Sequence, residues 1–132
     1  MPAASDASAR AAYDAKHYAE CGPQYAQLAA AVTDTTDRGR DQVVTLRWAE
    51  ASCEALAGQP DAAFAALDRG LAAGLHQRDE IEKDTDLAPL HTDPRWPPFL
   101  ANVAAADAAL LAAIAEPKLR AELHALVETD QA

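Results

Sequence analysis

The stretch that decides the fold is ALAGQPDAAFAALDRGLAAG, residues 55–74, in which alanine and glycine fill more than half of the positions. Such a composition suits either a flexible spacer or closely packed helices, and the order of the residues separates the two. Gly58 stands where helices commonly end, and Pro60 stands where a helix can begin without an amide donor. Asp61 suits the positive end of a helix dipole. We therefore predict a helix that ends at Gly58, a tight turn, and a second helix that ends at Gly74.

Apolar residues at helical spacing continue this pattern toward the N-terminus. They predict a helix from Asp41 to Gly58, preceded by a polar loop over TDTTDRGR, residues 33–40. Residues 3–32 predict two shorter helices, with Ser5 or Asp6 as the first N-cap. Gly22-Pro23 interrupts the second of these, and a kink or a shifted helix start is expected there.

The segment 75–98 is rich in acidic residues and prolines, and it leaves room for one short helix around 79–83. Four large apolar residues argue against a solvated loop, and we expect them to pack under the helices as a plug: Leu87, Leu90, Trp96 and Phe99. A helix is predicted from about 99 to 115, and Pro117 is expected to begin a last one. Since strand signals are scarce, the predicted class is all-α.

The formal net charge of −10, from 21 acidic and 11 basic residues, disfavours nucleic acid and anionic membranes as partners. No apolar stretch was found that approaches the roughly 18 residues of a spanning helix. The N-terminal residues do not read as a signal peptide. We therefore expect a cytoplasmic protein; a periplasmic one would fit a mature exported segment carrying an added Met.

Cys21 and Cys53 lie too far apart for a Cys-x-x-Cys redox motif and are too few for a zinc site. They fit either two buried free thiols, which is the plainer interpretation, or a disulfide. A disulfide would indicate an oxidising compartment.

The second hairpin resembles a tetratricopeptide-type repeat, in which small and bulky residues follow the turn at fixed offsets. Those places are held by Gly58, Ala63, Leu67 and Gly70, and more loosely in the first hairpin by Lys16, Cys21, Tyr25 and Leu28. The resemblance implies a right-handed superhelix of antiparallel helical hairpins over residues 1–100. It also implies a concave groove lined by the first helix of each hairpin. By position, the groove would contain Asp6, Arg10, Tyr13, Thr45, Trp48, Ser52 and Ala55. Trp48 fits equally a core anchor and a recognition residue.

Two further segments carry resemblances. The run DTDLAPLHTDPRWPPF, residues 84–99, is similar to the acidic terminal form of these repeats in many bacterial proteins, although Pro97-Pro98 is unusual. KLRAELHALVETDQA, residues 118–132, resembles the opening helix of a bacterial domain of unknown function. Residues 101–132 are accordingly interpreted as C-terminal capping helices or as the start of a truncated second domain.

No pattern of catalytic or metal-binding residues emerges. The four histidines are scattered without partners at ligand spacing: His17, His76, His91 and His124. Asp84, Asp86 and Asp93 lack the ladder of a calcium loop and suit solvated or capping roles, with Arg95 clamping the loop beside Asp93. The acidic residues around His124 are interpreted as surface charge. No cofactor or metal is expected.

These observations favour a non-catalytic module that binds a protein or peptide, preferably basic, in a groove. Two alternatives remain open: an inhibitor- or immunity-type protein that binds one basic partner, and the N-terminal part of a larger bacterial enzyme. The last helix could also mediate self-association.

Overall fold

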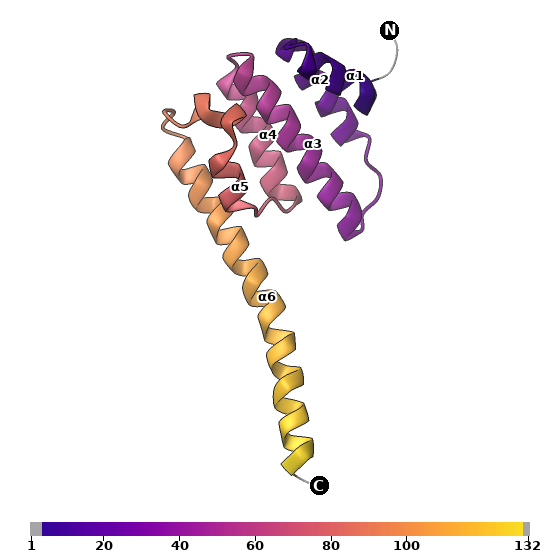
Figure 1. Cartoon of the computed structure of the whole chain (residues 1–132), viewed down its shortest axis with the longest axis vertical. Coiled ribbons are helices and arrows are strands. Elements are labelled where there is room, and N and C mark those ends of the chain that lie inside the picture. Colours follow the sequence, from indigo (N-terminus) through magenta and orange to yellow (C-terminus); the bar gives the residue numbers. More distant parts are fainter. Residues whose placement is uncertain (1–3, 131–132) are drawn as a thin grey trace.

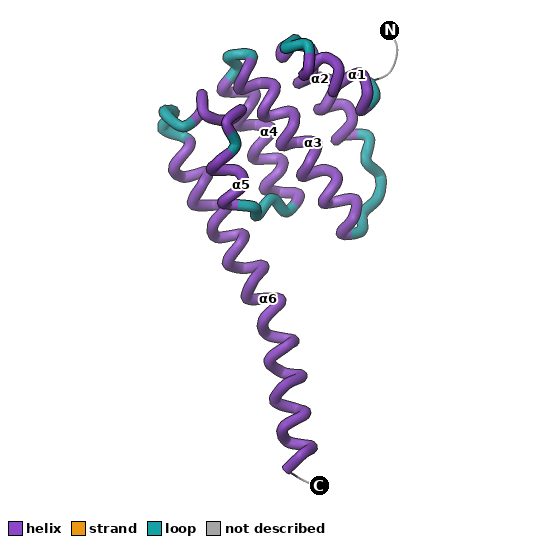
Figure 2. The backbone as a smooth tube through the Cα atoms, in the orientation of Figure 1, coloured by secondary structure: helices purple, strands orange, loops and turns teal. Residues whose placement is uncertain are grey.

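The computed structural model describes the backbone of residues 4–130, with the side chains of residues 4–118, 121 and 122. This part of the chain contains helices and no strand, which confirms the all-α class (Figure 2). The elements in order are α1 (Asp6–Asp14), α2 (Tyr18–Ala30), α3 (Asp37–Leu56), α4 (Pro60–Ala73), α5 (Arg78–Lys83), the 3-10 helix η1 (Thr85–Leu90) and α6 (Trp96–Asp130).

The first four helices lie side by side, each in contact with the next along the chain (Figure 1). The central one is α3, which contacts α2 on one side, α4 on the other, and η1. The start of α6 contacts both α4 and the short helix α5. Beyond this packed body, residues 4–107, the rest of α6 projects alone as an arm, residues 108–130.

The turn at the centre of 55–74 forms as predicted. Helix α3 ends at Leu56, and Gly58 has a φ of +75°, a conformation that glycine adopts without steric cost. Pro60 begins α4, and Gly74 closes it with a φ of +119°. Ala55, Ala63 and Ala66 are buried, so this alanine-rich stretch is part of the core and not a spacer.

Two predictions near the N-terminal half need correction. Helix α2 begins at Tyr18 and runs through Pro23, so its start is not shifted by the proline. Helix α3 begins at Asp37, inside the predicted 33–40 loop. The reason is a close approach: a Cβ at Gly39 would lie 1.9 Å from the carbonyl oxygen of Asp34. Gly39 therefore allows the first turn of α3 to pack against the loop that precedes it.

The predicted plug is present. Leu87 and Leu90, from η1, are essentially inaccessible to solvent, and Trp96 and Phe99 are buried with them. They join the main core beside Phe64 of α4, whose ring meets that of Phe99 edge to face. The acidic, proline-rich segment therefore folds over the hairpins as an ordered cover, with one short helix at Arg78–Lys83 as expected.

The predicted pair of C-terminal capping helices is wrong. A single helix, α6, begins at Trp96 and continues through Pro117 to Asp130, crossing the domain boundary predicted after residue 100. Pro97 and Pro98 fall in its first turn, where amide donors have no helical partner. Pro117 removes one backbone hydrogen bond, to Ala113, in a run of strong helix formers.

The expectation that no apolar stretch is long enough to span a membrane also needs correction. Within the described residues, Trp96–Lys118 is one helix of 23 residues that meets the length and composition of a spanning segment. Only 11% of its most apolar window is buried by the rest of the protein. The same stretch forms one side of the body and the beginning of the arm (Figure 1).

Candidate functional site

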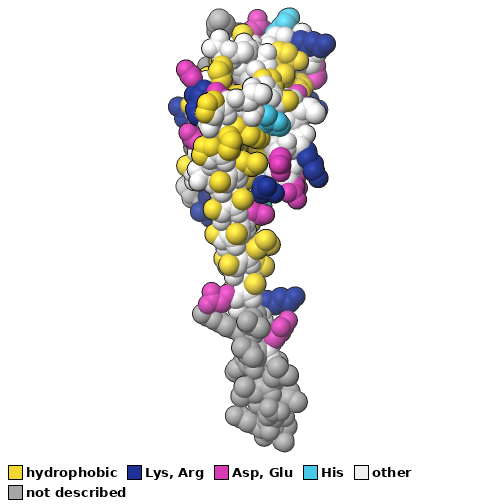
Figure 3. Space-filling view, turned by 90° about the vertical axis from the view of Figure 1, so that its left-hand side faces the viewer, with side chains coloured by type: hydrophobic (Ala, Val, Ile, Leu, Met, Phe, Trp, Pro, Cys, Tyr) yellow, Lys and Arg dark blue, Asp and Glu magenta, His cyan; other side chains and the backbone are white. Residues whose placement is uncertain are grey.

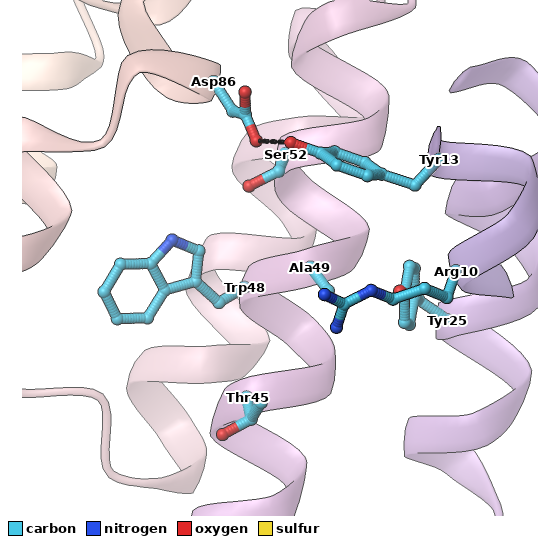
Figure 4. Close-up of a pocket in the computed structure, with 8 residues that line it drawn as sticks. All are labelled: Arg10, Tyr13, Tyr25, Thr45, Trp48, Ala49, Ser52 and Asp86. Atoms are coloured by element: carbon cyan, nitrogen blue, oxygen red, sulfur yellow. Dashed lines mark hydrogen bonds between the residues drawn. The ribbon is translucent and has the colours of Figure 1, made fainter. Parts of the chain in front are cut away.

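A pocket of about 470 Å³ opens between α1, α2 and α3, with the η1 segment at one side (Figure 4). Its described lining combines three aromatic rings, an arginine, an aspartate and small polar groups. The residues are Arg10, Tyr13, Tyr25, Thr45, Trp48, Ala49, Ser52 and Asp86. The pocket is therefore built from helices that are contiguous in space and from one segment distant in sequence.

Five of the seven predicted groove residues lie around this pocket: Arg10, Tyr13, Thr45, Trp48 and Ser52. Asp6 instead lines a neighbouring hollow of about 440 Å³, which shares Thr45 with the pocket. Ala55, also expected in the groove, is buried in the core. Sequence reasoning missed Tyr25, Ala49 and Asp86 as lining residues.

The pocket wall holds a hydrogen bond between α1 and η1. The Tyr13 hydroxyl donates to Asp86 Oδ2 at 2.5 Å, across 73 residues of sequence. This hydrogen bond, followed by burial and the Asp86 charge, raises the pKa of Tyr13 to about 12. Tyr13 therefore stays a protonated donor at neutral pH and ties the first helix to the plug segment.

A second hydrogen bond holds Trp48 in place. Its indole Nε1 donates to Asp84 Oδ2 at 2.6 Å, while Asp84 Oδ1 accepts the backbone amide of Asp86 at 3.0 Å. Trp48 is half-buried, packs against the main core and also lines the pocket. The two interpretations of Trp48 are thus compatible, because the residue both packs against the core and lines the pocket. Asp84 caps the start of η1, one of the roles expected from the sequence, and Asp84 and Asp86 also accept hydrogen bonds from the pocket residues Trp48 and Tyr13.

Arg10 supplies the positive charge at the pocket. Its side chain extends from α1 toward Trp48, close to Tyr25 (Figure 4). Among the described residues, Arg10 forms no ion pair with a carboxylate. Burial raises the pKa of the nearby Tyr25, and the positive charge of Arg10 partly opposes that rise. The guanidinium is therefore a hydrogen-bond donor that the described protein leaves available to a ligand.

Cys21 and Cys53 form a disulfide, with their Cα atoms 5.9 Å apart. The bond joins α2 to α3 and lies in a small core cluster against which Tyr13 and Tyr25, two lining residues of the pocket, are packed. Both half-cystines are inaccessible to solvent. Of the two interpretations left open by the sequence, the structure has the disulfide, which keeps the tyrosine-bearing helices against α3.

The remaining polar candidates lie away from the pocket. Arg95 donates to Asp93 and, at 2.8 Å, to Asp61, and its guanidinium lies 4.6 Å from the Phe64 ring centroid. Hydrogen bonds from Arg95 lower the pKa of Asp93 to about 2. This is the local clamp expected from the sequence, and it also joins the plug to the start of α4.

Histidines and acidic residues assemble no metal centre in the part of the chain that is described, where no group of three such ligands occurs. His76 Nδ1 lies 3.4 Å from Asp107 Oδ1, and neither residue lines the main pocket. The side chain of His124 and its acidic neighbours Glu128 and Asp130 fall outside the described side chains.

No family model, curated protein or solved structure matches this chain. The likeness to tetratricopeptide-type repeats therefore rests on the sequence positions given above. The superhelical arrangement that it implies stays a prediction.

Proposed function

We propose that this protein is a non-catalytic binding module that takes an extended, basic peptide segment of another protein into the pocket on α3. The observation that supports the proposal is the grouping of Tyr13, Tyr25 and Trp48 around an open cavity that also holds Arg10 and Asp86. Aromatic rings with a few placed polar groups are typical of sites that bind by contact and hydrogen bonding.

The chemistry of a peptide suits this mixture of groups. Backbone carbonyl oxygens can accept hydrogen bonds from Arg10, whose guanidinium has no carboxylate partner among the described residues. The faces of Tyr25 and Trp48 favour aliphatic stems and cationic groups of basic side chains. Asp86, which uses Oδ2 for Tyr13, adds a negative charge to the same wall.

The neighbouring hollow extends this surface along α3. It shares Thr45 with the pocket and brings Asp6 and Asp41 beside it, with Arg38 at its edge. A peptide that follows α3 would pass from the aromatic pocket into this more acidic region. The net charge of −10 would accelerate its capture if the segment is basic.

The test is a selection of peptides from a random displayed library on the immobilised full chain, followed by calorimetric titration of synthetic copies. We expect enrichment of Lys- or Arg-containing sequences. Thr45→Arg, which places a long side chain across both hollows, should weaken their binding at least about tenfold, the effect of losing a central interface contact. Thr35→Arg makes the same change in the exposed loop before α3 and should leave binding unchanged.

The acidic surface also favours a second candidate, an inhibitor- or immunity-type role toward one basic protein. That role predicts that no library peptide binds, whereas one basic protein encoded beside this chain forms a stoichiometric complex. Equal binding of selected peptides to the Thr45→Arg and Thr35→Arg variants would contradict the pocket as the site.

A further inference from the structure

The pocket lies between two parts of the body that have separate apolar cores. The first hairpin, α1 and α2, contributes Arg10, Tyr13 and Tyr25 to the lining, and α3 and η1 contribute the other described residues. Figure 4 shows the hairpin side chains extending toward α3 from one side. The main core contains residues from α3 onward and no described residue of the hairpin. Binding in the pocket therefore depends on how firmly the hairpin is held against α3.

The disulfide is the centre of the contact between the hairpin and α3. The small cluster there has three buried members, of which Cys21 lies on α2 and Cys53 on α3, with Ala12 of α1 as the third. A side-chain hydrogen bond, from Tyr13 to Asp86, also joins the hairpin to the rest of the body. The disulfide and this hydrogen bond thus hold the same wall of the pocket in place.

We propose that the Cys21–Cys53 disulfide is a redox switch for the pocket. The oxidised chain binds its peptide, and reduction by a dithiol opens the hairpin and releases the peptide. This regulation rests on the peptide-binding function proposed above. Three of the eight described lining residues lie on the hairpin, among them the arginine and two of the three aromatic residues. Opening therefore removes most of the groups that would hold the peptide.

The exchange needs only the two cysteines and the dithiol. A thiolate of the dithiol attacks one sulfur of the pair, forms a mixed disulfide with it and releases the other cysteine, which takes up a proton. The second sulfur of the dithiol then displaces the remaining cysteine and closes a disulfide within the reductant. The protein gains two electrons and two protons, and the dithiol loses the same number.

Burial couples this chemistry to movement of the hairpin. Cys21 and Cys53 are both 0% exposed, so a dithiol reaches them when the hairpin has moved away from α3. Reduction then leaves two thiols, which need more room than two bonded sulfurs, in a closely packed site. It also removes the cross-link that restricts the open chain. The reduced hairpin therefore opens more often than the oxidised one.

The rest of the body keeps its own packing when the hairpin opens. Helix α3 stays in contact with α4 and η1, and Trp48 stays bonded to Asp84. The side of the molecule drawn in Figure 3, where α6 runs down from the body, is turned away from the hairpin. The open state is thus a partly folded chain that closes again when the disulfide re-forms.

Hydrogen exchange of the full chain, followed by mass spectrometry, tests the switch without a ligand. Dithiothreitol should accelerate amide exchange in α1 and α2 at least about tenfold, because the cross-link is lost. Exchange in α4 should change less than about twofold, since its core is separate. The double variant Cys21→Ala, Cys53→Ala is the control and should not respond to dithiothreitol. Equal hairpin exchange in oxidised and reduced chains would overturn the proposal.

The rate of reduction measures the opening independently. Tyr13→Phe removes the second attachment and should accelerate reduction by dithiothreitol about fivefold, the effect of one lost hydrogen bond. Tyr18→Phe removes a hydroxyl beside the same cluster, leaves the Tyr13–Asp86 bond in place and should not change the rate. Alkylation of the freed thiols and weighing of the chain give both rates. Equal rates in the two variants would overturn the requirement for opening, and a disulfide that resists dithiothreitol would overturn the switch.

Binding of a cysteine-free peptide selected from the displayed library distinguishes this proposal from the proposed function. Its dissociation constant should rise at least about tenfold in dithiothreitol and recover after reoxidation. By the same linkage, saturating peptide should slow reduction of the disulfide. Equal affinity for both redox states would overturn the switch. If no peptide binds the oxidised chain, the proposed function fails, and hydrogen exchange of the hairpin still decides whether reduction opens it.

Discussion

The body and the arm are made from the same kinds of residue but differ in what covers them. Leu87 in the body is fully buried, whereas Leu111 in the arm is 60% exposed. The body's side chains are covered by segments far apart in sequence, as the bonds from Tyr13 and Trp48 to the plug illustrate. Helices of the body therefore depend on tertiary packing, while the described arm is held by backbone hydrogen bonds within one helix.

The largest difference should appear in a matched pair of truncations. Leu87→Ala should lower the free energy of unfolding by about 2–5 kcal/mol, because it leaves a cavity in the core. Leu111→Ala should change it by less than about 0.5 kcal/mol, since its side chain is already largely in water. Urea unfolding followed by circular dichroism measures both. Similar losses would show that the arm is covered by the body in solution.

Removing the disulfide should also affect the body alone. The double change Cys21→Ala and Cys53→Ala opens a loop with a sequence separation of 32 residues and should cost about 2–4 kcal/mol. Urea unfolding of the oxidised wild-type protein and of the double variant measures this difference in the free energy of unfolding. Thiol titration of the oxidised wild-type protein in denaturant provides the control and should find no free thiol. Two free thiols would contradict the disulfide.

The Tyr13–Asp86 bond predicts a smaller, pH-dependent effect on the body. Below pH 10, the ordinary pKa of a tyrosine hydroxyl, the group is protonated in both folded and unfolded chains, and the stability that its hydrogen bond contributes is complete. Because folding raises the pKa to about 12, that stability should disappear as pH rises from about 10 to about 12. Tyr13→Phe should cost about 1 kcal/mol at neutral pH.

Unfolding of wild type and Tyr13→Phe at several pH values between neutral and about 12 would measure this effect. The difference in stability between the two proteins should shrink across the alkaline window. A difference that stays constant with pH would show that the hydroxyl does not titrate differently in the folded chain.

The smallest effect on the body is expected at Pro117. Pro117→Ala restores a backbone donor in the arm and removes a local penalty of about 3 kcal/mol, so helix content should rise. The free energy of unfolding of the body should change by less than about 0.5 kcal/mol, because nothing described couples this part of the arm to it. A stabilised body would refute the independence of the arm.

Local chemistry made much of the fold predictable. Gly58 and Pro60 mark a turn because their backbone preferences suit it whatever surrounds them. The plug was predictable because large apolar residues in an acidic segment require burial. Two local predictions were wrong: the polar segment 33–40 was predicted as a loop, although α3 begins at Asp37, and Pro117 was predicted to begin a helix, although it lies inside α6.

The candidate pocket was only partly predictable. Placing Thr45, Trp48 and Ser52 on one face of α3 needs only the helical repeat. Asp86 was missed as a lining residue because its place opposite Tyr13 depends on how the plug folds over α3. Tyr25 was predicted only as a bulky position of the first repeat, and it in fact lines the cavity.

The sequence by itself determined the helical class, the central turn in 55–74 and the burial of the plug, because these follow from backbone preferences and from the aversion of apolar groups to water. Only the tertiary structure decided that Cys21 bonds to Cys53, that Asp84 and Asp86 hold two pocket aromatics, and that α6 leaves the body as an arm. Each of these depends on distances between segments that are remote in the chain, and local preferences carry no information about such distances.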